Sequence, residues 1–212
     1  MTKKTLVVVS YGYGTENPFY DLFKRIKYTS KRDPAILTKG DVVLFEGGTD
    51  INPSLYGQEA GSYTGFSDEQ RDEFEVSVFN EAKKLDIPML GICRGAQFLC
   101  AMSGGKLAQH VNKHGRDHLV TDNKGHEYKV TSTHHQMMLP KGTNHELVAY
   151  ATEATVHLGE KDIPLAVEKD AEVVYFKDTN ALAIQGHPEY LHSHEHMVIK
   201  CREYVKEYLL NI

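Results

Sequence analysis

The sequence predicts an α/β fold built around a mostly parallel sheet. Short apolar runs at residues 5–10, 41–45 and 87–92 have the length and the β-branched composition of buried strands. Segments with helical spacing separate or follow these runs in the first half of the chain. Strands that alternate with helices are typical of a parallel sheet that is covered on both faces.

Four helices are predicted. The first covers residues 18–26, where a proline is followed by apolar residues at helical spacing. The second begins at a capping box formed by Ser67 and Gln70 and carries an apolar face. The third covers residues 94–103 and ends at two glycines, and the fourth covers residues 194–210.

The second half of the chain is richer in predicted strands, at residues 128–133, 147–152, 173–176 and 181–185. Residues 178–180 are Asp, Thr and Asn, which are typical of a hairpin turn between the last two strands. Antiparallel strands are therefore expected beside the parallel sheet. No repeat or long linker divides the chain, so one domain is predicted over residues 1–212.

The composition excludes several classes of protein. The chain has 212 residues, 25% of them charged, and a net charge of −5, which is not the positive balance of a general nucleic-acid binder. No apolar run approaches the ~20 residues of a transmembrane helix. Three cysteines are too few for a disulfide framework, and Cys100 and Cys201 are expected to be buried structural thiols. We therefore expect a soluble, cytoplasmic protein that binds neither nucleic acid nor membrane.

Cys93 lies where a predicted strand meets a predicted helix, between Gly91 and Gly95. This is the layout of a nucleophile elbow, where the nucleophile occupies a tight turn and bulky residues two positions away would collide. The helix N-terminus favours a thiolate, and the backbone N–H of Arg94 is placed to stabilise an oxyanion. Cys93 is therefore the predicted nucleophile.

His187 follows the predicted strand 181–185, at the carboxyl end where open parallel sheets bind ligands. Residues two apart share a face in an extended segment, so Glu189 is expected to contact the His187 ring. A base with a carboxylate that orients it would complete a triad with Cys93. Without the cysteine elbow, a turn with a solvated histidine would be the better interpretation of this segment.

Two groups among the twelve histidines have a spacing that can hold a metal ion: His110, His114 and His118, and His192, His194 and His196. Gly115 interrupts any helix through the first group, and no cysteine or carboxylate cluster completes a site for it in the sequence. The second group leads into the last predicted helix and is expected to be a solvated helix start. No metal is therefore expected.

The segments GICRGAQ around Cys93 and GHPEY around His187 resemble the class I glutamine amidotransferase-like superfamily. Four more segments resemble its γ-glutamyl hydrolase branch of cysteine peptidases, which includes bacterial γ-glutamyl-γ-aminobutyrate hydrolases. These segments are FEGGTDINPSLYG (45–57), RDEFE (71–75), SGGKLAQHV (103–111) and THHQM (133–137). Residues 11–40 form a shorter connection than this branch would have, so one strand–helix unit is expected to be reduced there.

The resemblance implies a flavodoxin-like three-layer sandwich with a Cys-His-Glu triad. Cys93 is then the nucleophile, His187 the base and Glu189 its orienting partner. The implied oxyanion hole consists of backbone N–H groups of Gly47, Gly48 and Arg94. The side chains implied to contact the substrate are Gln97, His134, His135 and Gln136. No cofactor is implied.

Three functions remain open at this point. The first is a stand-alone hydrolase of γ-glutamyl amides that acts through a γ-glutamyl thioester. The second is a glutaminase subunit that supplies ammonia to a separate synthase, because the GxCxGxQ motif serves both. The third is a non-catalytic binding module on the same fold. The complete triad favours an enzyme whose substrate is glutamine or a γ-glutamyl amine, and both a homodimer and a synthase partner stay open.

Overall fold

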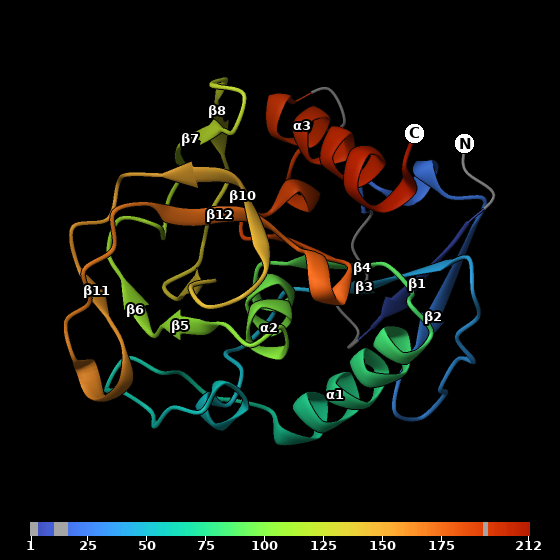
Figure 1. Cartoon of the computed structure of the whole chain (residues 1–212), viewed down its shortest axis with the longest axis horizontal. Coiled ribbons are helices and arrows are strands. Elements are labelled where there is room, and N and C mark those ends of the chain that lie inside the picture. Colours follow the sequence, from blue (N-terminus) through green and yellow to red (C-terminus); the bar gives the residue numbers. More distant parts are fainter. Residues whose placement is uncertain (1–3, 11–16, 193–194) are drawn as a thin grey trace.

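An eleven-stranded sheet forms the centre of the molecule (Figure 1). The computed structural model describes all residues except 1–3, 11–16 and 193–194. Five neighbouring strands are parallel, in the spatial order β2 (Arg25–Thr29), β1 (Thr5–Val9), β3 (Asp41–Phe45), β4 (Met89–Ile92) and β13 (Ala181–Ile184). The antiparallel part continues with β12 (Asp170–Phe176), β10 (His145–Ala151), β7 (His118–Asp122) and β8 (Glu127–Val130). The predicted combination of a parallel sheet with added antiparallel strands is confirmed.

Short strands extend this arrangement beside β12. Strand β9 (Met137–Leu139) pairs with β12 and with β5 (Lys106–Ala108). A separate two-stranded sheet consists of β6 (His110–Val111) and β11 (His157–Leu158). None of these four short strands is predicted from the sequence, because two or three residues carry no readable alternation.

Helices cover both faces of the sheet and give three layers (Figure 1). Helices α1 (Glu69–Lys84) and α2 (Arg94–Met102) pack on one face with every second residue of β1, such as Val7. Helix α3 (His196–Tyr204), which continues as a π-helical turn over Val205–Leu210, packs on the other face with Val8. The flavodoxin-like sandwich is therefore confirmed. Within the described residues, no helix is both long and apolar enough to cross a membrane.

The predicted helix over residues 18–26 is wrong. Only a 3₁₀ turn over Tyr20–Leu22 forms there, and the chain then enters β2, which pairs in parallel with β1. The apolar spacing that suggested a helix arises because Phe19 and Phe23 flank this turn and pack into the core. No α-helix lies in the described residues between β1 and β3, which agrees with the expected reduction of one strand–helix unit.

Other predicted elements are present with shifted ends. Helix α1 is capped by Asp68, whose carboxylate accepts hydrogen bonds from the backbone N–H groups of Gln70 and Arg71 at 3.0 and 3.1 Å. The predicted capping box of Ser67 and Gln70 is therefore wrong by one residue. The hairpin between β12 and β13 is confirmed, with Asn180 left-handed at φ 50°. The last helix begins at His196, and residue 194 lies outside the described residues.

The two glycines that flank Cys93 are required by close packing. A Cβ atom added to Gly95 would lie 2.1 Å from the carbonyl oxygen of Phe45 on β3. A Cβ atom added to Gly91 would lie 2.4 Å from the carbonyl oxygen of Gly95. The predicted collision is confirmed, and it involves main chain that cannot move without displacing a core strand.

We expect the Gly95→Ala variant to be destabilised by about 3 kcal/mol, because overpacking against main chain forces the backbone to shift. Urea denaturation measures the free energy of unfolding. Gly115→Ala is the matched control, since an added Cβ there meets no atom within 4 Å, and it should change stability by less than about 0.5 kcal/mol. Equal stability of the two variants would contradict the close contact at Gly95.

Candidate active site

Cys93 occupies the turn between β4 and α2 with a strained backbone, at φ 50° and ψ −108°. A non-glycine residue adopts this conformation only where its surroundings impose it. Two hydrogen bonds do so: the Cys93 N–H donates to the Ile184 carbonyl at 2.8 Å, and the Gln97 N–H donates to the Cys93 carbonyl at 3.1 Å. The structure therefore has a strained turn at Cys93 between strand and helix, where the sequence predicts the elbow.

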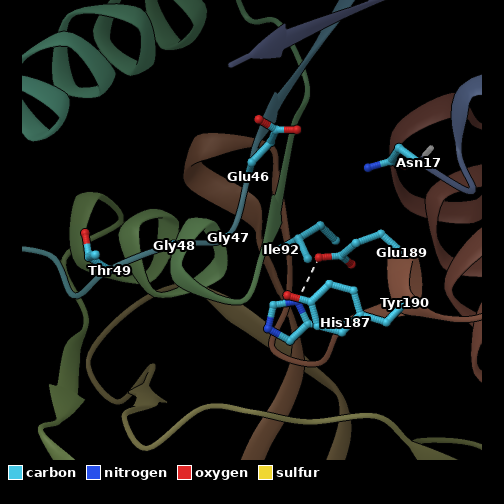
Figure 2. Close-up of a pocket in the computed structure, with 9 residues that line it drawn as sticks. All are labelled: Asn17, Glu46, Gly47, Gly48, Thr49, Ile92, His187, Glu189 and Tyr190. Atoms are coloured by element: carbon cyan, nitrogen blue, oxygen red, sulfur yellow. Dashed lines mark hydrogen bonds and ion pairs between the residues drawn. The ribbon is translucent and has the colours of Figure 1, made fainter. Parts of the chain in front are cut away.

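His187 reaches the same edge of the sheet from the neighbouring strand. Strands β4 and β13 are parallel and in register, with Ile92 opposite Ile184, so both chains leave the sheet side by side. The His187 Nδ1 atom lies 2.7 Å from Glu189 Oε1 (Figure 2). The predicted extended geometry is wrong, because Pro188–Tyr190 form a 3₁₀ turn, but the predicted contact is present.

The environment of His187 favours its charged form. Burial lowers the pKa of His187, but hydrogen bonds with Cys93 and Glu189, together with the charges of these two groups, raise it to about 10. The ring of Tyr190 stacks on His187 with centroids 4.4 Å apart and planes 4° apart. These contacts fix the imidazole ring between Cys93 and Glu189.

The glycine turn after β3 borders the same cavity (Figure 2). A Cβ atom at Gly47 would lie 3.3 Å from His187 Cε1 and 3.7 Å from Cys93 Cβ. Gly48 has a φ of 147°, and a Cβ atom there would lie 2.2 Å from Arg71 Nη1. The absence of a side chain at Gly47 therefore lets the main chain pass close to Cys93 and His187, and its absence at Gly48 leaves room for the Arg71 guanidinium.

Arg94, the first residue of α2, is buried and forms part of a network of ion pairs. Its guanidinium contacts the carboxylates of Glu75 and Asp72 on α1. Arg71 Nε lies 2.8 Å from Glu75, and Arg71 Nη2 donates to the Glu46 carbonyl at 2.9 Å. The sequence predicts only an apolar face for α1. It does not predict the charged contacts that connect α1 with the elbow and with the glycine turn.

All four predicted substrate-binding residues line the cavity. Gln97 lies on α2 and donates from Nε2 to the Gln136 carbonyl at 3.1 Å. Gln136 Nε2 in turn donates to Asp50 at 3.0 Å, and His135 Nε2 lies 3.2 Å from the other Asp50 oxygen. The hydrogen bond with Asp50 is the main cause that raises the pKa of His135.

His134 also borders the cavity, but its ring nitrogens are directed elsewhere. Nδ1 lies 2.8 Å from the Gln136 carbonyl, and Nε2 lies 3.7 Å from Glu172 Oε1 behind the cavity wall. The predicted contact of His134 with a substrate is thus less direct than that expected of His135.

Asp50 and Tyr190 are site residues that sequence reasoning missed. Asp50 joins the glycine-rich loop to the segment of residues 133–137, and Tyr190 covers one face of His187. Both lie within the quoted resemblance segments, as the Asp of GGTD and the Tyr of GHPEY. Their roles depend on neighbours distant in sequence, so the local pattern alone could not assign them.

The other two cysteines are buried, as predicted. Burial raises the pKa of Cys100 to about 12, and burial also raises the pKa of Cys201. Neither residue lines the cavity around Cys93. Only Cys93 therefore combines access to that cavity with a histidine partner.

The positions of the predicted triad lie in a segment that matches a known protein family. The Peptidase C26 family matches residues 26–189, which include all three of them. The chain belongs to the peptidase C26 family. It is therefore an enzyme of the hydrolase or amidotransferase kind, within the class I glutamine amidotransferase-like superfamily.

This C26 chain is 28% identical over 211 residues to a glutamine amidotransferase-like protein, YvdE, of Lactococcus lactis, covering 86% of this chain and 83% of YvdE. Matches of this chain to three further relatives cover between 25% and 56% of the length of those relatives. A Thermoplasma acidophilum structure, provisionally described as one subunit of GMP synthase, has a TM-score of 0.65 at 18% identity over 99% of this chain and 94% of that one. A glutamine amidotransferase of Thermotoga maritima has a TM-score of 0.59 at 17% identity over 100% and 86%.

We expect iodoacetamide to alkylate Cys93 of this C26 protein orders of magnitude faster than Cys100 or Cys201, because the thiolate is the reactive form and burial suppresses it at the other two sites. Peptide mass spectrometry after timed quenching measures the three rates. The His187→Asn variant should slow alkylation of Cys93 alone. Equal rates at all three thiols would refute the nucleophile assignment.

His187 should keep both ring protons at about pH 8, where an ordinary histidine with a pKa of about 6.5 is neutral. NMR of ¹⁵N-labelled imidazole groups reports the protonation state. Glu189→Gln removes a charge that raises the pKa of His187, so the titration midpoint should fall. An unchanged midpoint would show that Glu189 does not stabilise the imidazolium.

Proposed function

We propose that this protein hydrolyses γ-glutamyl amide bonds, with Cys93 as nucleophile, His187 as acid and base, and Glu189 as the group that orients His187. The observation that carries this proposal is the chain of contacts at one cavity. Cys93 and His187 line one cavity, their interaction raises the pKa of His187, and His187 Nδ1 lies 2.7 Å from Glu189. A thiol beside an oriented imidazole is the arrangement required for acyl transfer.

In the proposed acylation step, the Cys93 thiolate attacks the γ-carbonyl carbon of the substrate. The negative charge that develops on the carbonyl oxygen is stabilised by backbone N–H groups of Arg94 and of the Gly47-Gly48 turn. The His187 imidazolium then donates its Nε2 proton to the leaving nitrogen. The C–N bond breaks, the amine departs, and a γ-glutamyl thioester remains on Cys93.

In the proposed deacylation step, neutral His187 removes a proton from water while the water oxygen attacks the thioester carbon. The C–S bond breaks, glutamate leaves, and Cys93 is again a thiolate beside a protonated His187. In both steps Glu189 fixes the imidazole tautomer and balances the imidazolium charge.

The walls of the cavity suit a small polar substrate. Gln136 and His135 approach from the segment of residues 133–137, and Asp50 approaches from the glycine-rich loop. The carboxylate of Asp50 would attract the α-ammonium group of a glutamyl substrate. Because this segment resembles the hydrolase branch, we favour hydrolysis by the chain itself.

A glutaminase subunit is the second candidate. The Thermoplasma acidophilum protein, which shares the fold, is provisionally described as part of a synthase. The same acyl-enzyme would release ammonia when glutamine is the substrate. In this case the chain alone would be nearly inactive, and a partner synthase would be needed for turnover.

The purified chain should release p-nitroaniline from γ-glutamyl-p-nitroanilide, and Cys93→Ala should lower kcat/KM by at least about 10⁴-fold. Glu189→Gln should lower it by about 10²–10⁴-fold, because the imidazole loses its orientation and its counter-charge. Absorbance of the released amine and coupled detection of glutamate give both rates.

His145→Asn is the matched control for His187→Asn, because His145 is a partly buried histidine that does not line the cavity. His145→Asn should keep the activity and His187→Asn should lose it. A folded chain that alkylates at Cys93 but turns over neither glutamine nor γ-glutamyl amines would contradict the hydrolase proposal and favour the synthase-dependent glutaminase.

A further inference from the structure

A second cluster of chemically active side chains lies behind the wall of the Cys93 cavity and is not used by the proposed mechanism. It consists of His114, His118, His134, Asp170 and Glu172. All five residues are at least nine-tenths buried, with His114 at 0% and Glu172 at 1% exposed. Two β-strands and two loops bring them together. The first and the last of these residues, His114 and Glu172, are 58 positions apart in the sequence.

Three imidazole rings surround one carboxylate oxygen. Glu172 Oε1 lies 3.1 Å from His114 Nδ1, 3.0 Å from His118 Nε2 and 3.7 Å from His134 Nε2. Four ligand atoms held tetrahedrally by metal–nitrogen bonds of about 2.0 Å would be about 3.3 Å apart. The three separations from Glu172 Oε1 bracket this value, and the ligand atoms of His114, His134 and Glu172 all lie within 4.8 Å of one another.

The outward-facing nitrogen of each ring contacts another acceptor. His114 Nε2 lies 3.0 Å from Asp170 Oδ2, and His118 Nδ1 lies 3.0 Å from the Arg116 carbonyl. His134 Nδ1 lies 2.8 Å from the Gln136 carbonyl. This is the arrangement that orients histidine ligands in metal sites, where the nitrogen away from the metal donates to a carboxylate or a carbonyl.

The hydrogen-bond pattern leaves polar atoms at the centre of the cluster without partners. A neutral imidazole carries one N–H, and in the rings of His114 and His134 the outer acceptor requires it, so their inner nitrogens present lone pairs toward the Glu172 carboxylate. His118 Nε2 is instead hydrogen-bonded to Glu172 Oε1 at 3.0 Å. His114 Nδ1, His134 Nε2 and Glu172 Oε2 accordingly have no hydrogen-bond partner among the described residues.

We propose that His114 Nδ1, His134 Nε2 and a Glu172 carboxylate oxygen bind a divalent transition-metal ion of the zinc type, and that His118 Nε2, which lies 3.0 Å from Glu172 Oε1, completes its coordination. A single ion would satisfy the three atoms that have no hydrogen-bond partner in the described part of the chain. Its charge of two would also balance the buried carboxylates of Asp170 and Glu172. Imidazole and carboxylate are ligands that suit zinc.

The site would be structural. Four protein ligands fill a tetrahedral coordination sphere and leave no open position for a substrate. His134 precedes His135 and Gln136, which line the Cys93 cavity, so a metal bound to His134 would hold this cavity wall in place. The proposal does not depend on the proposed hydrolase activity.

The sequence predicts no metal because no carboxylate cluster accompanies the histidines at 110, 114 and 118. That expectation about carboxylates is wrong, because β12 places Glu172 and Asp170 against His114. His110 lies elsewhere, stacked on Tyr63 at a centroid distance of 4.1 Å. The four-residue repeat therefore contributes two ligands without a helix.

The test uses the full chain with Cys93→Ala, so that metal held by the active-site thiol does not count. After removal of metals with a chelator, Co²⁺ is titrated and the visible absorption of tetrahedral cobalt is recorded. We expect one equivalent to bind with tetrahedral bands and to be displaced by one equivalent of Zn²⁺. Zn²⁺ should also raise the thermal denaturation midpoint of this protein.

Substitutions then locate the site. His134→Gln and Glu172→Gln should each weaken binding by at least about 100-fold, and Asp170→Asn by about 10–100-fold. His118→Cys should keep the ion and add a sulfur-to-cobalt charge-transfer band, which a merely structural role for His118 would not produce. His145→Gln is the control and should leave affinity unchanged.

Two results would overturn the proposal. The first is that the stripped Cys93→Ala protein, shown to be folded by near-UV circular dichroism, binds neither Co²⁺ nor Zn²⁺; protons alone would then satisfy the cluster. The second is that binding persists unchanged in His134→Gln and Glu172→Gln, which would place the ion at other histidines. The measurement on the parent protein decides the first result even if a variant fails to fold.

Discussion

The buried ion pairs of Arg94 connect the parts of the active site that the chain delivers separately. Arg94 begins α2 immediately after Cys93, and its guanidinium contacts Glu75 and Asp72 of α1. Arg71 donates a hydrogen bond to the Glu46 carbonyl, and the Asn52 N–H donates to Asp72 at 2.9 Å. Removing one partner of such a buried set typically costs about 3–5 kcal/mol, because a charge remains unpaired.

The strain at Cys93 is sustained by this framework. A left-handed cysteine is unfavourable by about 1–3 kcal/mol and persists only where its surroundings hold it. Strand pairing holds the residue from one side through the Ile184 carbonyl, and the Arg94 network holds α2 from the other. The strain places the sulfur atom at the edge of the sheet, where the next strand delivers His187.

The junction between the parallel and antiparallel parts of the sheet explains where the cavity lies. Strand β13 is parallel to β4 on one side and antiparallel to β12 on the other. The parallel neighbour contributes Cys93, whereas β12 contributes Glu172 and supports the segment that carries His134. The proposed triad and the histidine cluster are therefore built on opposite sides of one strand, which gives the cluster a direct structural connection to the cavity wall.

The amino-acid sequence by itself determined the alternating strands and helices and the positions of Cys93, His187 and Glu189, because strand length, flanking glycines and short motifs are local properties. Sequence patterns could not identify β2, because Ile26 also continues the helical spacing that begins at Phe19, and only pairing with β1 decides between strand and helix. They could not reveal that Arg71, Asp72 and Glu75 are buried, because charged residues on a helix are ordinarily solvated. Tertiary structure alone brought Asp50 to His135 and Glu172 to three histidines, since a contact between distant segments depends on strand order and not on spacing along the chain.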